Sequence, residues 1–590
     1  MIKLVEMKKC KVVFVVLMLM LGTPLIAQET GNSVLEQFKD TPSEKVYVSL
    51  NTSLLFTGEY LFYKVYCLND KTKQPSDIST IAYVELISEN TEVVFKHKIR
   101  LEKSRGQGDF FVPTTVPSGN YKLIAYTRWM KNGGMNRFFQ EDISIINPYQ
   151  TNQDAVLPDL SENVTSITEN RATNGEEDKR FILETDKESY PKKSKVALSI
   201  QNFRGASGYG NYNISVRKKE DLNHRPKRSP QSYIEWHAEQ MANAPIFYET
   251  IAFAPEGNGE LLKGRIRANS SDLALASQPI AISIPGEDFQ IKVVGTDSTG
   301  LFYINLSKDY AEPQAILQVL DAPKGSYTIE ILKDPPLDYS GLQFGRFLID
   351  TNMQDAIVRR SLHNQIENGY FAVKPDTLKL DALNDPYGGA YVETLDLDEY
   401  TRFKTLDETV VELVENVWTK RNKDKTVSFK VRSFDETYEE SEYDAMVFVD
   451  GVLMPDQTEL LEFDSRLIKT VNTVREKFAM GGTTYFGLIN LVTKDGNYYD
   501  LINATGMTKI ELDRPRLPKR YFAQSYAEDT NTRIPDFRDQ LLWQPNVSLE
   551  GSQMGLDFFT SEVPGEYELR LEGFSIYGRP VAITKTITVE

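Results

Sequence analysis

The feature that most constrains the fold of this 590-residue chain is an alternation of apolar and polar residues with a period of two. Residues 45–50 (Lys-Val-Tyr-Val-Ser-Leu) and 60–67 (Tyr-Leu-Phe-Tyr-Lys-Val-Tyr-Cys) are early examples, with a turn at Thr57-Gly58 between them. Side chains alternate between the two faces of a strand, so the pattern predicts strands with one buried face. Such strands, recurring about every 8–12 residues between Gly and Pro, predict a mostly β chain of sandwich domains.

Composition excludes several classes of function. Hydrophobic residues make up 41% of the chain, which is enough for packed cores and argues against a disordered protein. Lys and Arg number 67 against 84 Asp and Glu, a formal net charge of −17. A nucleic-acid binder needs a concentrated basic face, so we expect no nucleic-acid partner. At roughly 150 residues per domain, the length predicts about three to five domains.

The N-terminus has the pattern of a secretory signal peptide. Lys8, Lys9 and Lys11 precede an apolar run at residues 12–21, and Ala27 offers a cleavage point. We expect residues 1–27 to be removed, with an uncleaved anchor as the alternative. No other long apolar stretch follows, so the mature chain should lack a transmembrane segment and be soluble, or peripheral to a membrane through a partner. Cys67 is then the only cysteine, which favours a buried thiol over a disulfide.

The first domain is expected over residues 44–148. Residues 44–50 open it, residues 56–66 (Phe-Thr-Gly-Glu-Tyr-Leu-Phe-Tyr-Lys-Val-Tyr) follow a turn, and residues 116–123 (Val-Pro-Ser-Gly-Asn-Tyr-Lys-Leu) form a late hairpin. This order resembles the second macroglobulin-type domain of the α2-macroglobulin superfamily, which implies a macroglobulin-like β-sandwich. A generic immunoglobulin-like sandwich is the alternative.

Two further segments suggest the same kind of module. After a polar linker at residues 149–180, alternation resumes, and residues 181–255 predict a second macroglobulin-like sandwich. A basic cluster inside it, at residues 218–228, is expected to be a solvated loop. Residues 530–590 contain Trp-Gln-Pro and Pro-Gly-Glu-Tyr motifs and resemble a C-terminal macroglobulin-like sandwich.

The middle of the chain combines a small sandwich with a helix. Residues 256–345 alternate across tight turns and resemble a β-sandwich of the carboxypeptidase regulatory-like type. Residues 346–400 are expected to be a helical connector, because residues 353–370 have helical spacing. Four apolar residues are expected on one side of that helix: Ala356, Val358, Leu362 and Ile366.

Residues 401–505 carry the most specific motifs. An amphipathic helix is predicted over residues 400–418 and a strand over 426–431. A Val-Asp-Gly-Val strand end at Asp450-Gly451 follows, then a glycine turn, then a strand that ends in Thr-Lys-Asp-Gly. This order closely resembles the plug domain of TonB-dependent outer-membrane receptors, which implies an α+β domain inserted before the C-terminal sandwich. The whole combination resembles envelope proteins of Bacteroidota.

The residues of this plug-like motif suggest structural roles. Asp450 and Gly451 fit a tight hairpin, and three glycines allow a close approach where a side chain would clash. Only 94 residues follow Gly496, whereas a 22-stranded receptor barrel of about 10 residues per strand needs roughly 220, so we expect no barrel. The candidate motif residues are Asp450, Gly451, Gly481, Gly482, Gly487, Thr493, Lys494 and Gly496.

No catalytic pattern is present in the sequence. The four histidines lie far apart, and neither His-x-x-x-His nor Cys-x-x-Cys spacing occurs. No nucleophile elbow, phosphate-binding loop or macroglobulin thioester motif is found. Glu235-Trp-His237 and the acidic turn at residues 396–399 are expected to be ordinary polar segments. We therefore expect no enzyme activity, cofactor or metal.

Two functions remain after these exclusions. The favoured one is a non-enzymatic cell-envelope scaffold whose plug-like domain docks to an outer-membrane channel or transport complex, so an outer-membrane protein is the expected partner. The alternative is a soluble periplasmic or surface module that binds a peptide or glycan by β-strand addition at a sandwich edge.

Overall fold

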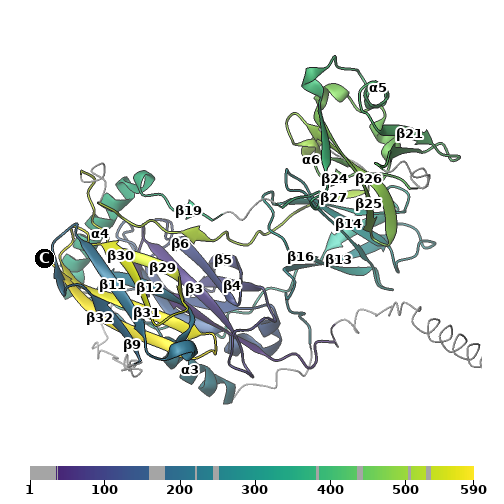
Figure 1. Cartoon of the computed structure of the whole chain (residues 1–590). Helices are drawn as coiled ribbons and strands as arrows, with labels where there is room; N and C mark the ends of the chain where they lie inside the picture. Colours follow the sequence, from purple (N-terminus) through teal and green to yellow (C-terminus); the bar gives the residue numbers. More distant parts are fainter. Residues whose placement is uncertain are drawn as a thin grey trace, which may run out of the picture.

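The computed structural model describes residues 35, 37–157, 180–219, 222, 224–242, 251–379, 384–434, 443–501, 506–526 and 533–590. The predicted signal peptide and most of the predicted linker at 149–180 lie outside these residues. The described chain is mostly β, as the sequence predicts. Figure 1 shows two lobes: a pair of sandwiches that includes β3 and β31, and a second lobe that includes β13 and β26.

Sandwich A is formed by two sheets from the N-terminal part of the chain. Its core contains mainly aliphatic and tyrosine side chains, together with the free thiol of Cys67. The smaller sheet contains, in order, β1 (Glu44–Leu50), β3 (Tyr60–Asn69) and β6 (Arg105–Phe111). The larger sheet contains, in order, β2 (Leu54–Phe56), β8 (Phe139–Ile146), β7 (Gly119–Tyr126), β4 (Ile81–Ser88) and β5 (Val93–Arg100).

Sandwich B is built from two segments that are far apart in the sequence. Its first sheet contains β30 (Gln553–Phe559), β11 (Lys195–Asn202) and β9 (Phe181–Thr185). Its second sheet contains β10 (Ser189–Tyr190), β32 (Pro580–Val589), β31 (Gly565–Ser575), β12 (Gly210–Lys218) and β29 (Gln540–Leu549).

The prediction of two separate sandwiches at 181–255 and 530–590 is therefore wrong. Strand β12 pairs with both β29 and β31, and β11 pairs with β30. The two segments also share one hydrophobic core, which contains Ile214 and Leu571. Each segment supplies only part of each sheet, so neither could cover its own apolar face alone.

The junction between sandwiches A and B is rich in buried polar groups. The Lys64 ammonium donates to the carbonyl oxygens of Tyr212 (3.2 Å) and Pro545 (2.5 Å), and burial lowers its pKa well below the usual value. The Glu572 carboxylate is fully buried and binds Lys227 at 3.0 Å. Burial alone would raise the pKa of Glu572, but the charges of Lys227 and Arg570 lower it. Charged side chains thus connect the two sandwiches.

The basic cluster at 218–228 is not the solvated loop that the sequence suggests. Lys227 and Arg228 have side chains only 11% and 10% exposed, and both bind acidic residues. The segment leads into helix α3 (Pro230–Ala242), whose Tyr233 is buried against Tyr47 with ring centroids 5.3 Å apart. The cluster is basic because its neighbours in the fold are carboxylates.

The second lobe begins with a small sandwich. Its core is aliphatic and includes Ile282, Ile304 and Leu317. One sheet contains β16 (Leu301–Leu306), β13 (Glu260–Ala268) and β18 (Tyr327–Ile331). The other contains β15 (Gln290–Gly295), β14 (Pro279–Ile284), β17 (Gln314–Val319) and β27 (Met507–Glu511). Strand β27 reaches this sheet from beyond the plug-like segment.

The plug-like segment forms a mixed five-stranded sheet and a separate hairpin. The sheet contains, in order, β20 (Val392–Asp396), β25 (Ile468–Met480), β26 (Thr483–Thr493), β23 (Met446–Val449) and β24 (Val452–Leu453). The hairpin pairs β21 (Val417–Arg421) with β22 (Val427–Val431). Strand β20 lies within the predicted helical connector at 346–400, so the sheet begins before the predicted boundary at 401.

The predicted helix at 400–418 is much shorter in the structure. Helix α5 spans Leu406–Glu412 and begins at a capping box formed by Thr405 and Glu408. Asn416 has a φ of 63° and turns the chain into β21. The remaining valines of the predicted helix therefore lie in the turn after α5 and in β21.

The junction between the plug-like sheet and the small sandwich is apolar. Its core contains Phe289 from the sandwich and Phe448 from the sheet, with ring centroids 5.1 Å apart. A Cβ atom on Gly451 would lie 2.3 Å from the Cβ of Phe289, so only glycine fits there. The other face of the sheet packs on α5 and the hairpin in a second core that includes Val410, Phe429 and Leu491.

Extended segments connect the two lobes along sandwich A. In one of them, Asp334 binds Arg128 at 2.7 Å and the Tyr339 hydroxyl donates to Glu85 at 2.5 Å. This segment leads into helix α4 (Gln354–Gly369). A second segment contains β28 (Lys519–Arg520), which pairs with β19 (Thr377–Leu378).

Helix α4 is present but buries only part of the face that the sequence predicts, since Ala356 packs with Ile357 on a small hydrophobic core. Val358 and Leu362 are 61% and 54% exposed. Arg360 is buried instead and makes two 2.8 Å hydrogen bonds to Glu59 of sandwich A. This bidentate ion pair holds α4 on sandwich A beside its apolar contacts.

The remaining described elements are short. They are η1 (Trp129–Gly133), η2 (Met135–Arg137), η3 (Gly205–Gly208), η4 (Thr351–Met353), η5 (Phe371–Val373), η6 (Leu397–Glu399), η8 (Gln457–Leu460), η9 (Ser465–Leu467) and α6 (Tyr498–Leu501).

Candidate functional site

The plug-like motif contains one tightly connected cluster of polar contacts. Asp450 and Gly451 form the β23–β24 turn, with φ values of 48° and 80°. The Asp450 carboxylate accepts hydrogen bonds from the Thr493 amide (2.7 Å), the Thr493 hydroxyl (2.5 Å) and the Tyr498 amide (2.9 Å). The Thr493 hydroxyl in turn accepts from the Gly496 amide at 3.1 Å. The cluster fastens the end of β26 to the turn.

The other motif residues lie apart from this cluster. Gly481 and Gly482 form the turn at the opposite end of β26, with φ values of 59° and 83°. Gly487 lies opposite the bulge of β25, and a Cβ atom there would meet Val431 at 2.4 Å. Lys494 pairs with Asp398 at 3.7 Å. These residues determine the shape of the sheet, and none of them lines either of the two cavities found among the described residues.

A cavity lies where sandwich A, sandwich B and helix α4 meet, and sequence analysis did not predict it. Its volume is about 190 Å³. Strand β3, strand β29, α4, η5 and the segment around Tyr521 all contribute to its wall. Ligand sites commonly lie at such junctions between domains.

Aromatic rings form one wall of this cavity. Four rings follow one another in nearly parallel pairs: Phe371 with Tyr60 (6.0 Å, 16°), Tyr60 with Phe62 (5.5 Å, 7°), and Phe62 with Trp543 (6.0 Å, 17°). Tyr521 meets Phe62 edge-on at 4.8 Å. Phe371 is 47% exposed whereas Trp543 is 3% exposed, so the series leads from the surface into the interior.

The charged residues of the cavity are matched in number and mostly paired. Glu59 binds Arg360, as described above. Glu367 accepts from Lys374 at 2.6 Å, and Asp376 lies 3.9 Å from Lys519. The lining contains the acids Glu59, Glu367, Asp376 and Asp539 and the bases Arg217, Arg360, Lys374 and Arg538. The cavity therefore has little net charge to attract an ion.

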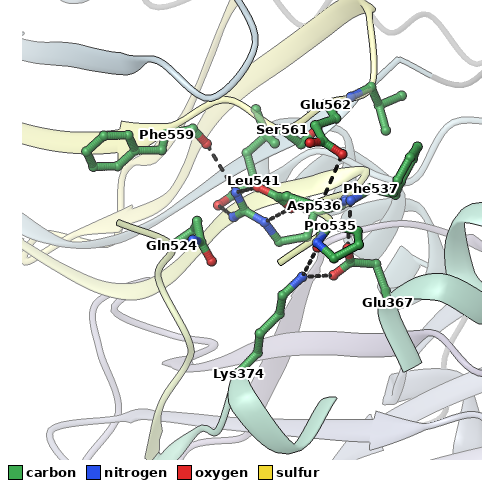
Figure 2. Close-up of polar contacts among 12 residues, drawn as sticks. Glu367, Lys374, Gln524, Pro535, Asp536, Phe537, Leu541, Phe559, Ser561 and Glu562 are labelled. Carbon is green, nitrogen blue, oxygen red and sulfur yellow. Dashed lines mark hydrogen bonds and ion pairs between the residues drawn. The ribbon is translucent and has the colours of Figure 1, made fainter. Parts of the chain in front are cut away.

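The rear of the cavity is held by a polar network (Figure 2). Lys374 and Glu367 point toward each other, and Glu367 also accepts a 2.6 Å hydrogen bond from the Phe537 amide. Arg538 binds Asp536 through two nitrogens, at 2.6 and 2.7 Å. Burial alone would raise the pKa of Asp536, but the charge of Arg538 lowers it. The network fixes the start of β29 against α4.

Two polar atoms of the cavity lining are buried without a hydrogen-bond partner among the described residues. They are the indole Nε1 of Trp543 and the Oδ1 of Asp539. The Asp539 oxygen lies 3.9 Å from the His363 Nδ1, which is beyond hydrogen-bond distance. Burial alone would raise the pKa of Asp539, but His363 and the charge of Arg360 lower it. A buried donor and a buried acceptor are thus left unsatisfied in one cavity.

A weak signal for this cavity exists in the sequence. Tyr60 and Phe62 alternate with the buried Leu61 and Tyr63, so strand β3 carries aromatic rings on the face that points away from its own core. Such rings need another partner. The cavity could not be located from this signal, because its walls come from segments up to several hundred residues apart.

Comparison with known proteins gives little information about the function of this chain. No profile of a known protein family matches the chain, and no curated protein sequence matches it. Among solved structures, Escherichia coli α2-macroglobulin activated by porcine elastase aligns with 93% of this chain and 44% of its own, at 10% identity and a TM-score of 0.24. Salmonella α2-macroglobulin reacted with methylamine aligns with 93% and 39%, at 9% identity and 0.23.

A shorter alignment involves Listeria innocua β-glucosidase in complex with isofagomine. It covers 18% of this chain and 16% of that one, at 15% identity and a TM-score of 0.13. The chain spans less than half the length of the two α2-macroglobulins. Its fold class rests on the sheets described above. In the described part of the chain, no helix is both long and apolar enough to cross a membrane.

Proposed function

We propose that the chain is a non-enzymatic scaffold of the bacterial cell envelope whose plug-like lobe docks to an outer-membrane channel or transport complex. The order of the plug-like motif and the export signal support this proposal. The observation that carries it is the placement of the plug-like sheet in a lobe that stands away from the sandwich pair (Figure 1). A partner could therefore reach this lobe without disturbing either sandwich.

The far end of the second lobe is the docking surface in this proposal. Helix α5 lies there in Figure 1, and its Val411 is 70% exposed. Leu467, on η9, is 48% exposed and belongs to a segment that is joined to α5, because the Leu406 amide donates to the Phe463 carbonyl at 2.9 Å. Exposed aliphatic side chains on neighbouring segments suit a contact with another protein.

Both faces of the plug-like sheet are already covered within this chain. The small sandwich packs on one face through Phe289, and α5 and the β21–β22 hairpin pack on the other. Docking through a whole sheet face would require one of these cores to open. The proposal therefore places the contact at the far end of the lobe.

The test is recovery of a tagged chain from detergent-solubilised outer membranes, with bound proteins identified by mass spectrometry. We expect a stoichiometric barrel protein, which the double variant V411D/L467D should lose. V93D is the matched control, because Val93 is 45% exposed on β5 of sandwich A, far from the docking surface. Equal recovery of the barrel protein with both variants would contradict the proposed surface.

A soluble binding module remains the second candidate. Among the described residues, strands β9 and β30 each have one hydrogen-bonded neighbour in their sheet, which leaves an edge to which a peptide could add a strand. Recovery of the chain alone, from the soluble fraction, would reject the docking proposal and favour this candidate.

A further inference from the structure

We propose that the cavity between the sandwiches and α4 binds a neutral sugar ring at the end of a glycan chain. This inference does not depend on the docking proposal, because the cavity and the docking surface lie in different lobes. It rests on three properties of the cavity: its aromatic wall, its two unsatisfied polar atoms and its balanced charge.

The aromatic wall suits a sugar ring. A pyranose has polarised C–H groups on its faces, and these pack favourably on the negative face of an aromatic ring. The series from Phe371 through Tyr60 and Phe62 to Trp543 offers such rings from the mouth of the cavity to its interior. A volume of about 190 Å³ leaves space for one sugar ring rather than for a folded chain.

The unsatisfied polar atoms suit hydroxyl groups. A sugar hydroxyl both donates and accepts, so it matches a donor such as the Trp543 Nε1 and an acceptor such as the Asp539 Oδ1. Both atoms are covered in the structure, so pairing with a ligand requires a small shift of the side chains over them. Both atoms belong to the segment that opens β29, and neither has a hydrogen-bond partner among the described residues. Leaving them unpaired costs stability, which a bound ligand would restore.

The balance of charge favours a neutral ligand. Each of the acids Glu59 and Glu367 already binds a basic residue of the lining, and Arg538 is held by Asp536. A charged ligand would have to break one of these buried pairs, and breaking a buried pair is costly. A neutral sugar leaves all of them in place.

The shape of the cavity favours the end of a chain over an extended peptide. A proline-rich peptide binds along an open groove lined by aromatic side chains. Here Tyr521 and Trp543 are only 8% and 3% exposed. Helix α4 and the segment around Tyr521 also line the cavity, so the aromatic wall faces other parts of the chain rather than a long open groove.

The test is isothermal titration calorimetry of the full chain with linear oligosaccharides of glucose, of mannose and of N-acetylglucosamine. A proline-rich peptide serves as the competing probe. We expect saturable binding of at least one oligosaccharide and none of the peptide. Failure of all three oligosaccharides to bind at millimolar concentration would overturn the proposal, as would binding of the peptide in the cavity.

Two adjacent aromatic residues provide a matched pair of variants. Phe371 lines the cavity, whereas its neighbour Tyr370 does not, although the two are similarly exposed at 47% and 40%. F371A should weaken oligosaccharide binding about tenfold through the loss of a stacking partner, and Y370A should leave it unchanged. Equal effects of the two variants would overturn the proposal.

A third variant tests the hydrogen bond. W543F retains an aromatic ring but removes the indole donor, so affinity should fall about fivefold. W418F is its control, because Trp418 lies on β21 in the other lobe. Circular dichroism checks that each variant is folded. Unchanged affinity in a folded W543F would remove Trp543 from the site and with it the hydrogen-bond argument.

Discussion

The two junctions of this molecule are built from opposite kinds of residue. Between sandwiches A and B, the buried Lys64 and Glu572 contact carbonyl groups and charged partners. Between the plug-like sheet and the small sandwich, Phe289 packs on Phe448 and on the bare backbone of Gly451. A polar junction is demanding in geometry, because each buried charge must find its partners. An apolar junction is demanding in shape, because its contacts leave no room for an added atom.

This difference separates two structural tasks. The polar junction sets the orientation of the two sandwiches and so positions the walls of the aromatic cavity. The apolar junction joins the sheet and the small sandwich into one lobe. Substitutions that act on one junction should leave the other unchanged, and each prediction below tests that separation.

The largest expected effect is at Glu572. E572Q should lower the free energy of unfolding of the sandwich pair by about 3–5 kcal/mol, because Lys227 would become a buried charge without a carboxylate. Hydrogen exchange read by mass spectrometry should show faster exchange in β12 and β31 and unchanged exchange in β25 and β26. E568Q is the control: Glu568 also binds Arg570 but is 34% exposed, so its loss should cost less than about 1 kcal/mol. Similar losses in E568Q and E572Q would contradict this account.

The second effect is a response to acid that is larger in the sandwich pair than in the second lobe. All four histidines of the sequence lie outside residues 251–331 and 384–511, which make up the second lobe. Burial lowers the pKa of His97 to about 3 and those of His224 and His237 to about 4. An unfolded histidine binds a proton below about pH 6.5, so between pH 6.5 and 3 the unfolded state holds more protons than the folded state. The free energy of unfolding therefore decreases as the pH is lowered through this range.

The lowered pKa of His97 alone should reduce the free energy of unfolding by about 3 kcal/mol at pH 4, since each pKa unit corresponds to roughly 1.4 kcal/mol. Calorimetry should show the melting transition of the sandwich pair moving down between pH 6.5 and 4, with a smaller change in that of the second lobe. H97Q should flatten the dependence. A parallel fall of both transitions in the native chain would show that the acid response has another source.

The smallest effect is at Gly451. G451A should destabilise the second lobe by about 2–3 kcal/mol, because its φ is 80° and the new methyl group would meet the Phe289 Cβ at 2.3 Å. G482A is the matched control: its φ is 83°, but nothing lies within 4 Å of the added atom, so only backbone strain of about 1 kcal/mol should remain. The melting transition of the lobe measures both. Equal shifts would mean that the close contact with Phe289 contributes nothing.

Local pattern predicted much of this fold. Strands β1 and β3 follow the alternation of residues 45–50 and 60–67, and Asp450-Gly451 lies at a turn of two positive φ values. Patterns of this kind depend on neighbours in the sequence, so they can be recognised without the structure. The end of α5 could not be recognised, because the positive φ of Asn416 interrupts valines that keep a helical spacing.

Long-range partners could not be predicted. Arg360 is buried because it binds Glu59, which lies about 300 residues earlier, and this pairing leaves Val358 exposed. The cavity has the same origin, since Tyr60 and Trp543 meet only when both sandwiches are assembled. A single sequence holds no record of such partners, and hydrophobic spacing does not predict that the Arg360 side of α4 is buried.

The split of sandwich B between β12 and β29 has a consequence for biogenesis. Strands β9 to β12 are synthesised long before β29 to β32. Their apolar faces therefore stay without their partner strands until the end of the chain has been made. The second lobe, encoded between them, can collapse in the meantime. Contacts of such high sequence separation close slowly. A chain of this design therefore exposes an unpaired sheet edge, which is prone to aggregation, until its last strands are synthesised.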